Sequence, residues 1–262
     1  MQNKTFWIAT GIALALWIGW LLATPPGLLG KADAIAYAVC ARDPAHSPFL
    51  GSRQMPLCFR CTGMHLGALL TLAWLAWRAP QRGGWPTKPI LAVLTLFTGA
   101  FVVDGGNAAL HDLWHLPALY PPANPLRLVT GLGMGVVIGV VVYTAGQQML
   151  WQRWEETPAL TGRGLTALLA AAGIAAALVL SGQPLVLFPI ALLTTADVVF
   201  LLTLVYTLLI ISVRQRINFA TTWRDLLPHL AVGHVFALLQ IITLDALRFA
   251  LTHTWGAFPP PH

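Results

Sequence analysis

The clearest indication of the fold is the segment Pro56-Leu-Cys58-Phe-Arg-Cys61-Thr-Gly-Met-His65-Leu-Gly-Ala-Leu-Leu-Thr-Leu-Ala-Trp-Leu-Ala-Trp77. A Cys-x-x-Cys pair runs directly into an apolar segment, Cys61–Trp77. At about 1.5 Å of rise per residue, a helix of this length nearly crosses a hydrocarbon core of about 30 Å. The stretch therefore predicts a membrane helix with two thiols at its mouth.

The composition of the whole chain agrees with a membrane protein. It is 57% hydrophobic and 9% charged, with a mean hydropathy of +0.71, which excludes an ordinary soluble domain. The net charge of +6 comes from cations that are spread among apolar runs, without a basic patch interleaved with aromatic residues. We expect the lipid bilayer as a partner, and no nucleic acid.

Apolar runs of sufficient length recur along the chain. They predict an all-α, polytopic transmembrane helix bundle of about seven spans: Phe6–Ala23, Cys61–Trp77, Pro89–Val103, Leu126–Leu150, Leu165–Ser181, Pro189–Ile211 and His229–Leu251. The first span follows Lys4 and ends at Ala23-Thr-Pro-Pro, a poor cleavage site, so residues 1–24 are expected to be an uncleaved signal-anchor helix.

The distribution of Lys and Arg predicts the orientation. With seven spans, nine cations fall on one side: Lys4, Arg78, Arg82, Lys88, Arg153, Arg163, Arg214, Arg216 and Arg224. Six fall on the other: Lys31, Arg42, Arg53, Arg60, Arg127 and Arg248. The richer side is expected to be cytoplasmic, which places the N-terminus inside and the cysteine loop outside.

The three cysteines of the chain, Cys40, Cys58 and Cys61, lie close together in sequence with His46 and His65 nearby. Thiolates at this spacing hold a soft metal ion or form a redox disulfide, whereas scattered free cysteines behave as small buried hydrophobes. Outside the cytoplasm unpaired thiols oxidise, so three reduced cysteines imply a metal or a redox cycle. We predict a tetrahedral site of the three sulfurs plus His46 or His65, holding zinc, or alternatively iron.

Other polar residues fall in the same outer half of the predicted bundle. Asp104 and Arg127 end adjacent spans, which predicts an ion pair or a direct role in the site. His111 and His115 share a helical face, as paired metal ligands or as interfacial anchors.

Two acids lie deeper in the predicted spans. Asp245 has Arg248 three residues later, whereas Asp197 has no partner in its own sequence neighbourhood. Together with the cysteines, these residues predict one outward-facing polar pocket.

Small residues predict close helix packing. Gly131, Gly135 and Gly139 recur at every fourth position in one span, and Gly63 and Gly67 do so in another. In lipid, this spacing lets two helices approach closely.

Pro56-Leu-Cys58-Phe-Arg60-Cys61-Thr-Gly63 resembles the motif P-L-C-x-R-C-T-G of a family of prokaryotic polytopic membrane proteins, domain of unknown function 2085. Cys40, Phe49 and Gly51 are similar to the stretch that precedes this motif, and Asp104-Gly105 and Asn124-x-x-Arg127-x-x-Thr130-Gly131 are similar to a second block. The resemblance covers roughly Tyr37 to Gly139. It implies a multi-pass protein of a prokaryotic cell membrane, in which Arg60, Asp104, Asn124 and Arg127 support the site, and it implies no established activity.

One position departs from the family pattern. The first cysteine of the family is similar to a Cys-His pair, whereas Ala41 and Arg42 follow Cys40 here. If that histidine is a ligand in relatives, His46 or His65 must replace it.

The chain is thus expected to divide into the anchor, a family-like core at 25–150 with the cysteine loop and three spans, and a three-span extension at 151–262. We predict a metal-binding membrane protein, whose ion is structural if it has four protein ligands and hydrolytic if one ligand is water. A thiol-disulfide oxidoreductase is the alternative, followed by a non-catalytic subunit of a larger membrane complex and by a transporter built on Asp197, Asp245 and Arg248.

Overall fold

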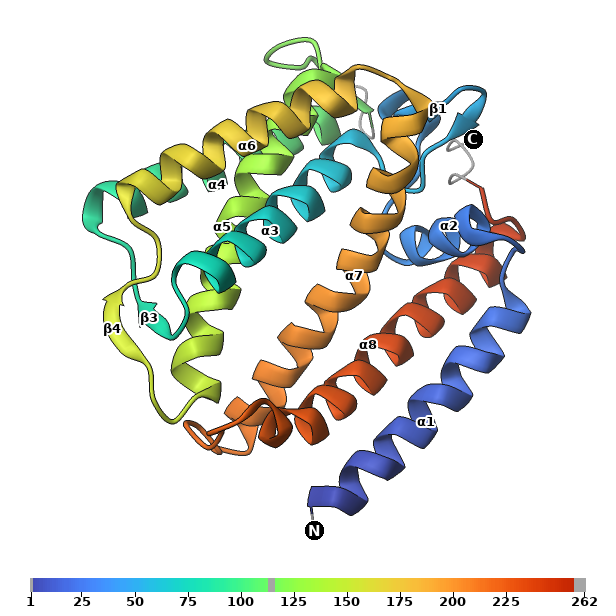
Figure 1. The fold of residues 1–262 in the computed structure, drawn as a ribbon. Helices are drawn as coiled ribbons and strands as arrows, with labels where there is room; N and C mark the ends of the chain where they lie inside the picture. The colour runs from blue at the N-terminus through green and yellow to red at the C-terminus, as the bar shows by residue number, and fades with distance from the viewer. Residues whose placement is uncertain (1, 113–115, 257–262) are drawn as a thin grey trace.

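The computed structural model describes residues 2–112 and 116–256, and these form a helical bundle (Figure 1). The helices are α1 (Gln2–Ala23), α2 (Leu28–Val39), α3 (Phe59–Arg78), α4 (Lys88–Asp112), α5 (Asn124–Leu150), α6 (Gly162–Leu180), α7 (Pro184–Val213) and α8 (Trp223–Thr252). Each predicted span corresponds to one of these helices, so the all-α membrane bundle is confirmed.

Six of the helices are long and apolar enough to cross a membrane: α1, α4, α5, α6, α7 and α8. The seventh predicted span, α3, has the required length but is less apolar, because it carries Arg60, His65 and two threonines. Its polar side chains Thr62, His65 and Thr71 are buried among neighbouring helices. A helix in this position needs less lipid-compatible surface than one at the edge of the bundle.

Proline positions explain two differences in helix length. We expected spans to start at Pro189 and near His229, but α7 begins at Pro184 and α8 at Trp223. Pro184 occupies the first turn, where its missing N–H costs nothing. Pro189 and Pro228 lie inside helices, which lipid-embedded bundles tolerate.

The predicted glycine positions form a close contact between α3 and α5. Gly63 and Gly67 of α3 face the glycine row of α5, so that a Cβ atom on Gly67 would overlap the Leu132 carbonyl oxygen and one on Gly135 would overlap that of Met64. The backbones therefore approach to a distance that no larger residue permits. This contact fixes α3, and with it Cys58 and Cys61, against the centre of the bundle.

Helix α2 was not predicted. It is too short to span a membrane, and it packs Ala34, Ala36 and Tyr37 against α7 and α8. Lys31 of α2 donates to the Thr24 carbonyl oxygen at 2.9 Å and also contacts the Leu21 carbonyl oxygen, at the C-terminal end of α1. Lys31 thus serves a helix end, where a cation is favourable.

Four short strands lie between the helices. β1 (Phe49–Leu50) and β2 (Arg53–Gln54) form an antiparallel hairpin between α2 and α3. β3 (Arg82–Gly84) and β4 (Glu155–Pro158) pair in parallel and join the α3–α4 and α5–α6 connections. The first pair lies with α2 at one end of the bundle, whereas the second lies toward the end where the N-terminus is found (Figure 1).

Candidate metal centre

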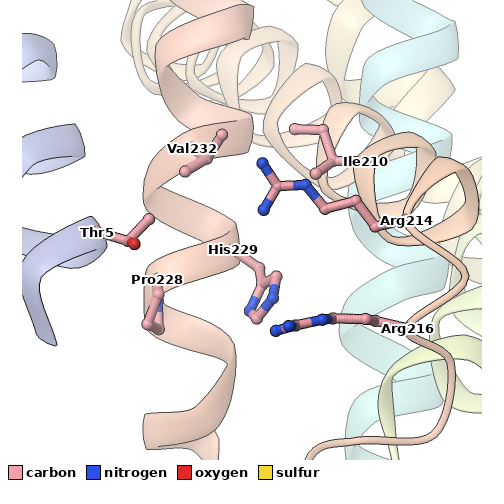
Figure 2. A pocket seen from close by; sticks show the side chains of 7 residues that line it. All are labelled: Thr5, Ile210, Arg214, Arg216, Pro228, His229 and Val232. Carbon is pink, nitrogen blue, oxygen red and sulfur yellow. The ribbon is translucent and has the colours of Figure 1, made fainter. Parts of the chain in front are cut away.

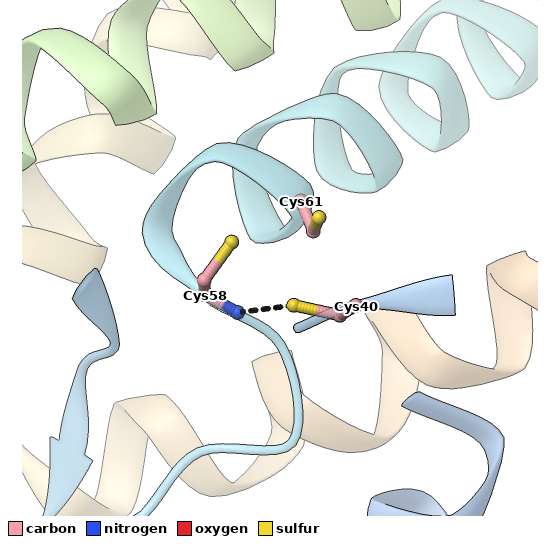
Figure 3. Close-up of side chains that lie close together, drawn as sticks. All are labelled: Cys40, Cys58 and Cys61. Atoms are coloured by element: carbon pink, nitrogen blue, oxygen red, sulfur yellow. Dashed lines mark hydrogen bonds between the residues drawn. The ribbon is translucent and has the colours of Figure 1, made fainter. Parts of the chain in front are cut away.

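Local structure brings the three cysteines together from two segments. Cys40 ends α2, and the chain returns through the β1–β2 hairpin, where Gly51 has a φ of +64° that a glycine adopts without strain. Cys58 then caps the N-terminus of α3 and Cys61 lies in its first turn. Figure 3 shows the three side chains close together at the start of α3.

The three sulfur atoms all lie within 4.8 Å of one another. The backbone N–H of Cys58 donates to Cys40 Sγ at 3.5 Å, and all three thiols are free. Cys40 is buried and the other two are half-buried, and Leu57 and Val198 pack around the group. The predicted gathering of cysteines is therefore present, in an apolar setting at a helix N-terminus.

Hydrogen bonds within the cluster give the thiols different pKa values. Contacts from the Cys58 and Cys61 side chains lower the pKa of Cys40 well below its usual value, although burial opposes this. The contact with Cys40 in turn raises the pKa of Cys58 to about 11. The Cys40 sulfur is thus favoured as a thiolate that accepts hydrogen bonds from the other two thiols. A bound cation would replace the protons of those hydrogen bonds.

The arrangement fits a tetrahedral metal site. Three sulfurs at Zn–S distances of about 2.3 Å would be about 3.8 Å apart. The sulfurs already lie within 4.8 Å, so side-chain adjustments of about 1 Å or less would suffice. The Cys58 N–H hydrogen bond to Cys40 Sγ is the kind of outer contact that orients metal thiolates.

His65 lies outside this group of three sulfurs. It is one turn beyond Cys61 on α3, where its Nδ1 is 3.0 Å from Asp197 Oδ2 of α7. Both side chains are buried, and Asp197 Oδ1 has no hydrogen-bond partner among the described residues. The sequence left the partner of Asp197 open, and the structure selects this histidine.

His46 also lies apart from the sulfurs. Its Nε2 is 3.5 Å from Asp112 Oδ2, at the end of α4, and its Nδ1 is 3.4 Å from Asp43 Oδ2. Asp112 also accepts from Arg127 at 3.0 Å, and Arg127 donates to Asn124 Oδ1 at 3.0 Å. These contacts tie the cysteine loop to α4 and α5.

The predicted ion pair of Asp104 with Arg127 is wrong. Asp104 instead accepts from Arg60 of α3 at 2.5 Å and from Thr130 at 3.1 Å, while Arg127 is paired with Asp112. The orientation of the helices about their axes decides these partners, which residue spacing does not reveal. Arg60 therefore links α3 to α4, and its charge is neutralised by Asp104.

Arg248 supports the site in a way that the sequence did not suggest. It reaches from α8 to the C-terminal end of α2 and donates to the carbonyl oxygens of Tyr37 at 2.7 Å, Cys40 at 2.6 Å and Ala41 at 2.9 Å. Asp245, its predicted partner, accepts from Trp20 of α1 at 2.9 Å. A long-range contact of this kind leaves no signal in the sequence.

The expectation of one shared polar pocket needs correction. The polar residues do gather at one end of the bundle, but they divide into separate hydrogen-bonded groups, because each buried charge takes its nearest partner on an adjacent helix. His111 contacts its neighbour Asp112 at 2.9 Å, and His115 lies outside the described residues. The cysteines thus form a group of their own.

Comparison with known proteins gives a family-model match to part of the chain and no function. Residues 40–141 match the model of the family described as "Predicted membrane protein (DUF2085)". The match begins at Cys40 and includes all three cysteines, α3, α4 and most of α5. No curated protein and no solved structure matches the chain.

Proposed function

We propose that residues 40–141, which match the model of the family described as predicted membrane proteins (DUF2085), form a thiolate metal site at one membrane face. Cys40, Cys58 and Cys61 would hold a zinc-like ion, with iron as the alternative. The proximity of the three sulfurs is the observation that carries this proposal. Thiolate ligands in tetrahedral geometry are typical of zinc and of iron–sulfur sites.

We propose His65 as the fourth ligand. It follows Cys61 by four residues on one helix, so both side chains project from the same face of α3. Metal-bound histidines usually donate their second ring N–H to a carboxylate, and Asp197 is placed to accept it from Nδ1. Nε2 would then be the ligand atom, and because His65 lies outside the group of three sulfurs its ring would have to move toward them. His46 is a weaker candidate because its two ring nitrogens already contact Asp43 and Asp112.

Four protein ligands would make the site structural. The ion would join the end of α2 to the start of α3 and hold the hairpin loop on the bundle. If water took the fourth position instead, the ion would activate it as a nucleophile. The excess of Lys and Arg on the opposite side supports a non-cytoplasmic location for the site.

Metal analysis of the purified full-length protein tests this proposal. We expect about one zinc or iron per chain in the original protein, with loss of the metal in Cys58→Ser and retention in Ser52→Ala, a control at the exposed hairpin turn. Replacement by Co²⁺ reports the ligands, because its absorption bands differ between three sulfurs with one nitrogen and three sulfurs with water. His65→Ala should change this spectrum and His46→Ala should not.

A redox role is the second candidate, because the sulfurs of Cys58 and Cys61 lie within 4.8 Å of each other at the start of α3, beside Cys40, the thiol whose pKa is lowered. Their two thiols would lose two protons and two electrons to an acceptor such as a membrane quinone as the disulfide forms. A free-thiol count before and after reduction separates the candidates. Absence of metal with two thiols protected until reduction would refute the metal site and favour the oxidoreductase.

A further inference from the structure

A cavity of about 490 Å³ lies at the end of the bundle opposite the cysteines. It is formed where α1, α7 and α8 meet, and its polar lining consists of Thr5, Arg214, Arg216 and His229. Figure 2 shows the two guanidinium groups on either side of the His229 ring, with Thr5 of α1 on the other side of the α8 ribbon in this view. The polar lining thus comes from α1, from α8 and from the segment that follows α7.

The two arginines have no acidic partner among the described residues, although they lie close together. The nearest acid in sequence, Asp225, accepts hydrogen bonds from Thr221 and Thr222 at the start of α8. Arg214 and Arg216 are both exposed, and an anion bound between them would offset the repulsion of their like charges. A phosphate group, with several acceptor oxygens, fits this lining because arginine binds phosphate through paired N–H donors.

An apolar groove continues from the cavity. It has a volume of about 220 Å³ and runs between α1 and α8, lined by Ile8, Ala9, Ile12 and Val235. Thr5 and Val232 line both the cavity and the groove, so the two are continuous. A cationic cavity that opens into an apolar groove matches a molecule with a phosphate at one end and a hydrocarbon chain at the other.

We propose that this composite site binds one anionic phospholipid, with its phosphate among Arg214, Arg216 and His229 and one acyl chain along the α1–α8 groove. Basic pockets between transmembrane helices are known to hold anionic headgroups on the cytoplasmic side. The excess of Lys and Arg predicts that this end is cytoplasmic. The bound lipid joins α1 to α7 and α8 and stabilises the bundle at an end where Arg82–Glu155, between β3 and β4, is the one ion pair among the described residues. The proposal does not depend on a metal at the cysteines.

Lipid binding is measured on the delipidated full-length protein in a neutral detergent, by native mass spectrometry and by the shift of the thermal unfolding midpoint. The probes are phosphatidylglycerol, phosphatidylcholine with the same acyl chains, and inorganic phosphate. We expect phosphatidylglycerol to bind and to raise the midpoint, with little effect of the other two. Arg214→Ala with Arg216→Ala should weaken its binding about 25-fold, at about fivefold for each arginine.

Two control variants separate the site from general charge effects. Arg153→Ala with Arg163→Ala removes the same charge from exposed positions on the same side and should leave binding unchanged. Arg214→Lys with Arg216→Lys retains the charge without the paired donors and should give an affinity between those of the original protein and the alanine variant, which also checks that the fold tolerates changes at these positions. Equal binding by the cavity and control alanine variants would overturn the proposal. Equal stabilisation by inorganic phosphate would overturn the lipid and indicate a free-anion site.

Discussion

The arginines at the two ends of the bundle differ in their partners. At the cysteine end, Arg60, Arg127 and Arg42 are each paired with an aspartate, at distances of 2.5 to 3.0 Å. At the other end, Arg214 and Arg216 face a cavity and have no acidic partner among the described residues. The same residue type therefore serves internal pairing at one end and is available to an external anion at the other.

The two ends are held together by different contacts. The cysteine loop has little regular structure of its own, so an ion pair with α4 and hydrogen bonds with α5 and α8 fix the positions of its thiols. The opposite end is already held by the β3–β4 pair and by a bridge between Trp151 and Ala220, and its arginines are not needed for that purpose. Charge that does not support the fold can serve binding.

The largest expected effect comes from breaking a buried pair at the cysteine end. Asp104→Ala would leave Arg60 without its carboxylate near the membrane boundary, and removing one half of a buried pair costs about 3–5 kcal/mol. Arg214→Ala with Arg216→Ala removes two arginines that pair with no acid in the described part of the chain, so in delipidated protein it should change the free energy of unfolding by less than about 0.5 kcal/mol. Reversible unfolding in mixed detergent micelles measures both.

A double variant is the control for this contrast. Arg60→Met with Asp104→Leu removes both charges and should recover much of the lost stability, because replacing a buried pair by apolar residues is often neutral. If Asp104→Ala changed the free energy of unfolding as little as Arg214→Ala with Arg216→Ala does, the proposed difference between the two ends would be wrong.

The second largest expected effect comes from replacing Arg248 and concerns metal binding. Its guanidinium holds the carbonyl oxygens of Tyr37, Cys40 and Ala41, so Arg248→Ala should loosen Cys40 and lower zinc affinity about 10- to 100-fold. Arg248→Lys keeps the charge but not the forked donors, so it should give an intermediate affinity. Competition with a chromogenic chelator measures this. Unchanged affinity in Arg248→Ala would mean that Cys40 is positioned by other contacts.

The sequence predicted those features that depend on local pattern. The length of an apolar run is a local property, so each predicted span corresponds to a helix, and the Gly63/Gly67 and Gly131/Gly135 spacings predicted a close contact that α3 and α5 make. The spacing of the cysteines also predicted that their sulfurs would gather.

The partners of the charged residues depend on tertiary geometry and were not predictable in this way. Asp104 pairs with Arg60 rather than with Arg127 because of the rotation of the helices about their axes. Arg248 contacts residues about 200 positions earlier in the chain. Arg42 adopts a positive φ of 58°, and because this residue is not a glycine, the sequence did not indicate that conformation. Helix α2 was missed because it is too short to give a span signal.

The smallest expected effect separates the two histidines of the cysteine end. The side chain of His46 is 23% exposed, and its contacts with Asp43 and Asp112 are long, at 3.4 and 3.5 Å. Exposed contacts of this kind contribute about 0–1 kcal/mol, so His46→Ala should lower the free energy of unfolding by no more than that and should retain the full metal content. His65→Ala, measured in parallel, should lose zinc affinity. The reverse result, metal lost with His46→Ala and kept with His65→Ala, would make His46 the fourth ligand and leave His65 as a structural partner of Asp197.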